Sequence, residues 1–130
     1  MKSRSEALFQ LRPNLNLATS PLQNPLEHFQ NTCLRPILKF QNELLLEVFK
    51  MHIRKRKNLF YSLKKEDRPT YISNEISKDN QLRKLLQGIT LALFTFEELS
   101  FYQENKSEIN KRINRLIAQR LIDQLQLLEA

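Results

Sequence analysis

The strongest hydrophobic pattern in the chain lies between Asn24 and Lys57, where apolar residues recur at helical spacing. These residues form two neighbouring stripes. The first stripe comprises Phe29, Cys33, Ile37, Phe40, Leu44, Val48 and Met51. The second comprises Leu34, Leu38, Leu45, Phe49 and His52. A surface helix shows a single stripe, so two stripes predict one long central helix that is buried on two sides. The alternative is that one stripe forms the seam of an oligomer such as a homodimer.

The sequence also predicts where this central helix begins and where it bends. Asn24 is a favourable N-cap, and Pro25 suits the first helical turn, whose N–H groups have no partner within the helix. Pro36 lies inside the pattern and removes one backbone hydrogen bond without ending the helix. We therefore expect a kink near residues 32–35.

Further helices are predicted on both sides of the central helix. Asp79 is the predicted N-cap of a helix that contains Gly88, the only glycine, and Thr95 and Glu98 form a capping box for the next helix. Glycine costs a helix about 1 kcal/mol relative to alanine, so we expect another helix to pack closely at Gly88. The remaining helices are expected at about residues 3–11, 58–65, 67–78 and 107–129.

The chain divides into an N-terminal arm, residues 1–23, and a helical domain, residues 24–130. Pro13 ends the short helix of the arm. Residues 14–23 are rich in Asn, Ser, Thr and Pro, which is typical of an extended linker. We expect this arm to be the mobile part of the chain, or the part that swaps between subunits.

Composition favours helices over strands. Leu, Lys, Glu, Gln and Asn are abundant, and these residues, Asn apart, are good helix formers. A single glycine disfavours tight hairpins and excludes glycine-rich phosphate loops. At 130 residues the chain has the length of one domain. The predicted fold is therefore all-α, a compact bundle of five to seven helices around the long, proline-kinked central helix.

The expected location is the cytoplasm. The single cysteine, Cys33, excludes an internal disulfide bond and fits a reducing compartment. The first residues are not followed by an apolar block, so we expect no signal peptide. No stretch approaches the roughly 18 consecutive apolar residues that a membrane span needs.

The net charge of +7 favours encounters with polyanions such as nucleic acid. Six basic residues at the end of the central helix and just beyond it are candidates for phosphate contacts: Arg54, Lys55, Arg56, Lys57, Lys64 and Lys65. Lys111, Arg112 and Arg115 would extend this basic patch if the two helices present them together. The alternative is a solvated helix end that binds no ligand.

Arg120 is a second candidate, because it lies in the middle of the apolar stripe of the last helix. A buried guanidinium needs an acidic partner, which Glu43 or Glu47 of the central helix could supply. A guanidinium whose stem passes the stripe to reach solvent is a further structural explanation. The functional alternative is that Arg120 anchors a ligand.

Residues that could support catalysis are few. His28 and His52 lie on different faces of the same helix and cannot share a metal ion without sharp bending. Cys33 is not spaced to contact His28, as a thiol–imidazole pair requires. The Glu-x-x-His pairs of di-iron bundles are absent. We predict no catalytic residue, no metal and no cofactor.

Several segments of the chain resemble a family of short, uncharacterised, all-helical bacterial proteins. The resemblance covers most of the chain after the linker and rests on Phe29-Gln30-Asn31, Leu34 to Asn42, Glu47-Val48-Phe49, Lys57 to Phe60, Asn110-Lys111-Arg112 and Arg120-Leu121. Some members of that family carry the label glyoxalase. The label implies lactoylglutathione chemistry at a metal bound by His and Glu in a βαβββ fold.

The residues of this chain do not carry the glyoxalase pattern. No strands are indicated, and the His-x-His-x-Asp-His box of hydrolytic glyoxalases is missing. The cofactor-free type needs a reactive cysteine on a glycine-containing elbow, whereas Cys33 lies in the middle of the predicted helix. We therefore transfer no catalytic residue from the label to this chain.

These observations lead to three hypotheses for function. We expect a non-enzymatic cytoplasmic binding or adaptor protein that recognises a protein partner through its helical surface. The first alternative is a nucleic-acid-binding protein that uses the basic helix end. The second alternative, a glyoxalase-type enzyme, depends on the family label alone.

Overall fold

The all-helical class expected from composition is confirmed. The computed structural model describes residues 2–13, 15 and 24–129, and the regular structure within these ranges contains helices and no β-strand. The α-helices are α1 (Arg4–Leu11), α2 (Pro25–Phe29), α3 (Arg35–Phe40), α4 (Asn42–Lys55), α5 (Leu59–Ser62), α6 (Arg68–Lys78), α7 (Asn80–Leu91), α8 (Phe96–Glu104), α9 (Lys106–Ile122) and α10 (Leu125–Leu128). A π-helical turn, η1 (Gln30–Leu34), joins α2 to α3, and a 3₁₀ turn, η2 (Lys65–Asp67), precedes α6.

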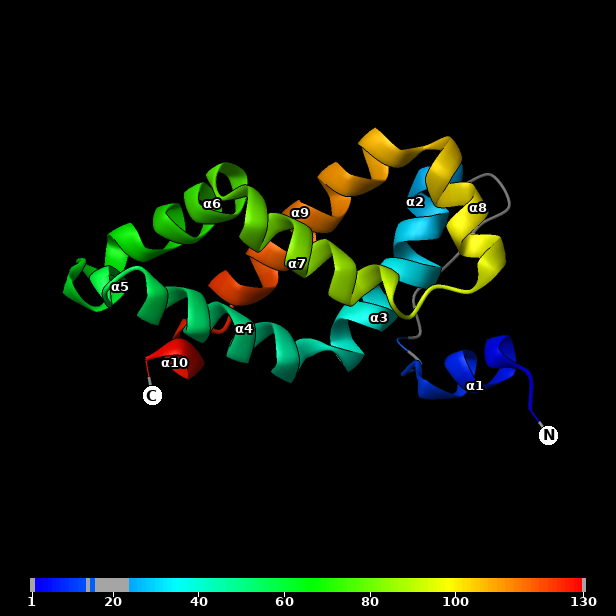
Figure 1. Cartoon of the computed structure of the whole chain (residues 1–130), viewed down its shortest axis with the longest axis horizontal. Coiled ribbons are helices and arrows are strands. Elements are labelled where there is room, and N and C mark those ends of the chain that lie inside the picture. The colour runs from blue at the N-terminus through cyan, green and yellow to red at the C-terminus, as the bar shows by residue number, and fades with distance from the viewer. Residues whose placement is uncertain (1, 14, 16–23, 130) are drawn as a thin grey trace.

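The core forms where α9 packs against its neighbours. Its apolar residues at four-residue spacing, Ile109, Ile113, Ile117 and Leu121, are fully buried. The helix α9 contacts α4, α6, α7 and η1, and Figure 1 shows it passing behind α7. Burial of side chains of this size stabilises a fold by about 1.5–3 kcal/mol each. No helix among the described residues is long and apolar enough to cross a membrane.

The predicted central helix comprises α2, η1, α3 and α4. Asn24 caps it as expected, since its Oδ1 accepts a hydrogen bond from the N–H of Leu26 at 2.8 Å. At the other end α4 stops at Lys55, two residues before the predicted end. Local capping chemistry therefore located the start of the helical run, whereas its end lies two residues earlier than expected.

Pro36 follows an irregular turn, in the place that the sequence predicted. Because proline has no N–H and its ring crowds the carbonyl four residues back, the regular hydrogen-bond ladder is interrupted in the turn before it. The backbone N–H of Arg35 bonds instead to the carbonyl of Gln30, five residues back, which defines the π-helical turn. A second break, at Gln41, was not predicted. Its φ and ψ of −86° and 4° are not those of an α-helix, and Figure 1 shows α4 leaving α3 in a new direction.

Burial differs between the two apolar stripes of this run. Every member of the second stripe is buried. The first stripe is buried as far as Ile37, but Phe40, Leu44 and Met51 are exposed. The break at Gln41, directly after Phe40, changes the direction of the run, so the stripe no longer follows the core, although Val48 of α4 is buried. The prediction of burial on two sides is therefore right as far as Leu38 and wrong for Phe40 and for much of α4.

The last predicted helix, residues 107–129, is two helices. Between α9 and α10, Gln124 has φ and ψ of −126° and 34° and exchanges two hydrogen bonds of 2.8 Å with Asn42 of α4. The break lets α10 pack against α4 and buries Leu128 completely. A tertiary contact thus outweighs the local propensity to continue the helix.

The predicted N-caps of α7 and α8 are also confirmed by their hydrogen bonds. The Asp79 carboxylate accepts from the N–H of Leu82 at 2.9 Å. Thr95 and Glu98 exchange the side-chain-to-backbone bonds of the predicted capping box. At the start of α6, the N-cap residue Asp67 makes no capping hydrogen bond with its side chain.

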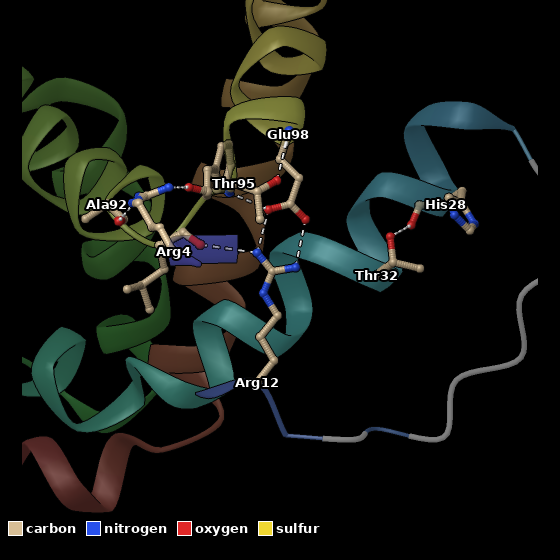
Figure 2. Close-up of polar contacts among 9 residues, drawn as sticks. Arg4, Arg12, His28, Thr32, Ala92, Thr95 and Glu98 are labelled. Carbon is tan, nitrogen blue, oxygen red and sulfur yellow. Dashed lines mark hydrogen bonds and ion pairs between the residues drawn. The ribbon is translucent and has the colours of Figure 1, made fainter. Parts of the chain in front are cut away.

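Two arginines fasten α1 to the segment between α7 and α8 (Figure 2). Arg4 donates hydrogen bonds to the carbonyl oxygens of Ala92 and Phe94. Arg12 donates to both carboxylate oxygens of Glu98. Backbone carbonyls at the end of a helix favour cations, so Arg4 meets the negative pole of α7. Most of the predicted linker, residue 14 and residues 16–23, lies outside the described residues.

Glu98→Gln should lower the stability of the fold in a pH-dependent way. Burial raises the pKa of Glu98, but hydrogen bonds from Arg12 and the Thr95 N–H, with the Arg12 charge, bring the pKa below its ordinary 4.5. A lowered folded-state pKa contributes stability above pH 4.5 that is lost as pH falls through the lowered pKa. Urea unfolding should show a loss of about 2 kcal/mol in the variant at neutral pH and a smaller loss at about pH 3.

The control for this measurement is Glu97→Gln, a change at the exposed neighbouring carboxylate in the same helical turn. Glu97→Gln should leave the free energy of unfolding almost unchanged at both pH values. Equal losses for Glu98→Gln at neutral and acidic pH would show that the carboxylate charge contributes nothing.

Gly88→Ala should stabilise the chain. The sequence predicted close packing at Gly88, but the residue is exposed, and no atom outside its own helical backbone and chain neighbours lies within 4 Å of an added Cβ. With nothing to clash with, alanine should raise the free energy of unfolding of the dilute protein by about 1 kcal/mol. Thermal or urea unfolding checks this, and a destabilised variant would mean that the space at Gly88 is occupied.

Candidate functional site: an arginine-lined cleft

A cleft of about 390 Å³ lies between α3 and α9. That volume falls within the range of small-ligand sites. Its lining residues are Arg35, Leu38, Arg115, Leu116, Gln119, Arg120, Asp123 and Gln124. Three guanidinium charges against one carboxylate leave two positive charges on the lining. We call this feature the arginine cleft.

Gln30 of η1 orients two arginines of α9 beside the cleft. Its side chain is buried, and its Oε1 accepts hydrogen bonds from Nη1 of Arg112 at 3.0 Å and from Nη2 of Arg115 at 3.2 Å. An amide oxygen carries no net charge. One buried acceptor therefore holds two guanidinium groups in place without cancelling their charges.

The π-helical turn brings Gln30 and Arg35 to the same side of their helix. In a regular α-helix, residues five apart point about 140° away from each other. In a π-helical turn the bond spans five residues, so Gln30 and Arg35 lie one turn apart on one side. Arg35 is held there by Asn31, whose Oδ1 accepts from its Nε at 3.1 Å. The irregularity linked to Pro36 thus places Arg35 opposite α9.

Arg120 lines the cleft without the carboxylate partner that the sequence suggested. Glu43 and Glu47 are both exposed, and Glu47 lies 3.4 Å from Lys50 of its own helix. The Nη1 of Arg120 donates instead to Oδ1 of Asn42 at 3.3 Å. The reason is helical register, because Asn42 lies on the side of α4 that meets α9 and α10 whereas the two glutamates face outward.

The positive charges in the cleft act on one another. The pKa of Arg120 lies below its ordinary value, chiefly because of burial and also because of the positive charge of Arg35, whereas Asp123 acts in the opposite direction. An arginine remains protonated at neutral pH all the same. An anion between Arg35 and Arg120 would therefore relieve repulsion between two like charges.

A second basic hollow, of about 550 Å³, lies between α6 and α9. Arg83, Lys111 and Arg115 are among its lining residues. Arg115 and Gln119 line both this hollow and the arginine cleft, so the positive surface continues across α9. Two of the three basic residues predicted on the last helix, Lys111 and Arg115, therefore border concave surfaces.

The basic helix end is separate from these hollows. Its six residues, Arg54, Lys55, Arg56, Lys57, Lys64 and Lys65, are exposed, and none of them lines either hollow. Figure 1 places the end of α4 beside α5, away from the first half of α9. Arg56 donates to the buried Glu75 at 3.1 Å, and Lys55 to Gln81 at 3.3 Å. The structure thus does not join the two halves of the predicted basic patch.

The histidines and the cysteine do not line the cleft. Nε2 of His52 lies 2.8 Å from a carboxylate oxygen of Glu75, and both side chains are buried. Cys33 is fully buried, and burial, followed by the charge of Glu98, raises the pKa of its thiol. His28 is exposed on α2. The charged and polar side chains of the cleft lining are therefore arginine, glutamine and aspartate.

Sequence reasoning missed several residues of this site, among them Gln30, Arg35 and Asn42. Arg35 and Asn42 lie inside the central helix, where attention to apolar stripes passes over single polar residues. Gln30 offered a signal, because it is a polar residue that follows Phe29 directly and precedes the proline-linked irregularity. No protein-family model matches the chain, and no curated protein or solved structure matches it. The residues of the site are therefore identified by geometry alone.

Gln30→Glu should raise the free energy of unfolding by about 1 kcal/mol, because Arg112 and Arg115 would then donate to a carboxylate instead of a neutral amide. Urea unfolding at neutral pH measures the change. Gln103→Glu, at an exposed position of α8, is the control with the same change in charge and should have little effect. A Gln30→Glu protein less stable than this control would contradict the expected pairing.

Proposed function

We propose that this chain is a non-enzymatic binding protein that takes up a small phosphorylated ligand in the arginine cleft. One observation carries the proposal. Arg35, Arg115 and Arg120 line a single cleft, and their hydrogen bonds with the described residues go to amide side-chain oxygens. Guanidinium groups pair with phosphate oxygens in a planar, two-bond geometry. The cleft therefore offers oriented guanidinium donors whose hydrogen-bond partners among the described residues are uncharged.

Charge and size both support a phosphate group as the ligand's head. The two positive charges that remain on the lining match the double negative charge of a phosphate monoester or the head of a diphosphate. Leu38 and Leu116 add an apolar surface for the rest of a small molecule. Sites for single-stranded nucleic acid use aromatic rings on which bases stack, and no aromatic residue is among those that line this cleft.

The lining also supports binding in preference to bond-making. It consists of arginine, glutamine, leucine and a single carboxylate, Asp123, whose Oδ1 accepts a hydrogen bond from Gln119 at 2.8 Å. A nucleophile activated by a neighbouring base would need a different set of side chains. The groups present orient and neutralise an anion.

Inorganic pyrophosphate is a suitable first probe for this proposal. Isothermal titration calorimetry should show binding at one site, and thermal unfolding should move to higher temperature relative to sodium chloride of equal ionic strength. A ligand that binds the folded state at 100 times its Kd adds about 2.7 kcal/mol to stability. The absence of any heat or shift beyond that of the salt control would contradict the proposal.

Arg35→Gln should weaken pyrophosphate binding by about tenfold or more, because it removes one charge-assisted contact. Arg54→Gln, at the exposed basic helix end, is the matched control and should leave the affinity unchanged. Titration of a single-stranded oligonucleotide at several salt concentrations completes the test. Oligonucleotide binding that is lost in Arg54→Gln and kept in Arg35→Gln would favour the basic helix end and contradict the cleft.

A further inference from the structure

The outward side of α4 and α7 carries an unusual concentration of exposed apolar side chains. Leu44 and Met51 of α4 and Leu85 of α7 are each about half exposed, and the first two belong to the first stripe of the central helix. Between the two helices runs a groove of about 320 Å³ whose apolar lining includes Val48, Met51, Leu82 and Leu85. Contiguous exposed apolar surface of this kind marks interaction sites. We call it the α4–α7 face.

Gly88 lies on the same side of α7, three residues after Leu85. It is the only glycine of the chain, and no atom outside its own helical backbone and chain neighbours lies within 4 Å of an added Cβ. A glycine in the middle of a helix costs stability, and nothing in the described part of the chain requires one there. A residue without a side chain does permit another helix to approach α7 closely from outside.

We propose that the α4–α7 faces of two copies of this chain pack together about a two-fold axis that runs along the groove. In that arrangement each α4 lies on the partner's α7, and the exposed apolar side chains of both copies are buried together. Interfaces of this isologous type are the commonest in homo-oligomers. The stripe that is exposed on α4 then becomes the seam of a dimer.

The charges at the edges of the face select a second copy as the occupant. Helical spacing places the exposed residues Glu43 and Glu47, and at the far end of the helix the exposed Arg54, on the side of α4 away from the groove. It places the exposed Lys84 on the corresponding side of α7. A two-fold axis along the groove superposes these edges, so acidic residues of one copy meet the basic residue of the other. The first two turns of α4 therefore carry acid where α7 carries base, so this part of the surface is complementary to itself.

The positions of Glu47 and Lys84 along the axes of their helices also agree. Nε2 of Gln41, just before α4, donates to the carbonyl of Ile89, near the end of α7, at 3.1 Å. This contact places the start of α4 beside the end of α7, and the two helices run in opposite directions. At 1.5 Å per residue, Lys84 lies about 7.5 Å from this contact and Glu47 about 9 Å. Rotation about an axis along the groove preserves these levels. Glu47 of one copy therefore comes close to the partner's Lys84.

This inference does not rest on the proposed ligand of the arginine cleft. The residues that line the cleft and those that line the α4–α7 groove do not overlap. Loss of pyrophosphate binding would leave the dimer untouched, and a monomeric protein would leave the ligand proposal untouched.

Sedimentation equilibrium of the full chain tests the dimer. We expect the apparent mass to rise from 15.5 kDa towards twice that value as concentration increases. Leu44→Lys should abolish the rise, because it places a charge in the apolar seam. Leu59→Lys, at an equally exposed leucine on α5, should leave it unchanged. A chain that stays monomeric at roughly 100 μM, or a dimer that Leu44→Lys does not weaken, overturns the proposal.

A charge exchange tests the two-fold arrangement itself. Glu47→Lys and Lys84→Glu should each raise the dimer Kd about tenfold, and the protein that carries both changes should recover most of the original affinity. The 3.4 Å pair of Glu47 with Lys50 cannot produce that recovery, because Lys50 is the same in all three variants. If each single change weakened the dimer and the protein with both changes did not regain affinity, the pairing of α4 with the partner's α7 would be overturned.

Gly88→Ala separates packing within one copy from packing between copies. The change should raise the dimer Kd about tenfold, because a methyl group now stands where the partner's helix approaches. It should do so although the same change stabilises the dilute chain. A dimer of unchanged affinity in Gly88→Ala would overturn the close approach at this position.

Discussion

Pro36 cannot donate a backbone hydrogen bond, and the arrangement of the arginine cleft follows from that one missing N–H. Directly before Pro36 the helix forms a π-helical turn, in which the N–H of Arg35 donates to the carbonyl of Gln30. The longer reach aligns these two residues on one side, where they face the arginines of α9. A regular helix in the same place would point one of them elsewhere. The local cost of an irregular turn is thus linked to a positively charged concave surface.

The amide side chains of Gln30 and Asn42 orient the arginines at the cleft but stabilise the fold less than carboxylates would. Carboxylates at the positions of Gln30 and Asn42 would bind the arginines more strongly than the amides do. They would also neutralise the charge that the cleft presents to solvent. Elsewhere the fold does use the stronger pairing, as between Arg12 and Glu98, where the arginine serves to attach α1. Arg12 therefore stabilises the fold, whereas Arg35 and Arg115 are oriented by the fold.

Local chemistry made much of the fold predictable, and tertiary contacts account for the rest. Asn24 and Asp79 were identified as caps because a cap depends only on residues a few positions away. The break at Gln124 could not be predicted in this way, since it depends on hydrogen bonds with Asn42, which is distant in sequence. The site was predicted in part. The basic residues of α9 stood out by charge, whereas Arg35 became a candidate only when the opposing helix was placed.

The burial of Cys33 gives the protein an internal reporter of its own fluctuations. The thiol is fully enclosed, and the raised pKa keeps it in the unreactive protonated form. It is also the only cysteine, so any alkylation of the native protein comes from this one atom. A reagent can reach the sulfur only during moments when the helices around it separate. The rate of labelling in native buffer therefore measures how often this part of the core opens, without any engineered probe.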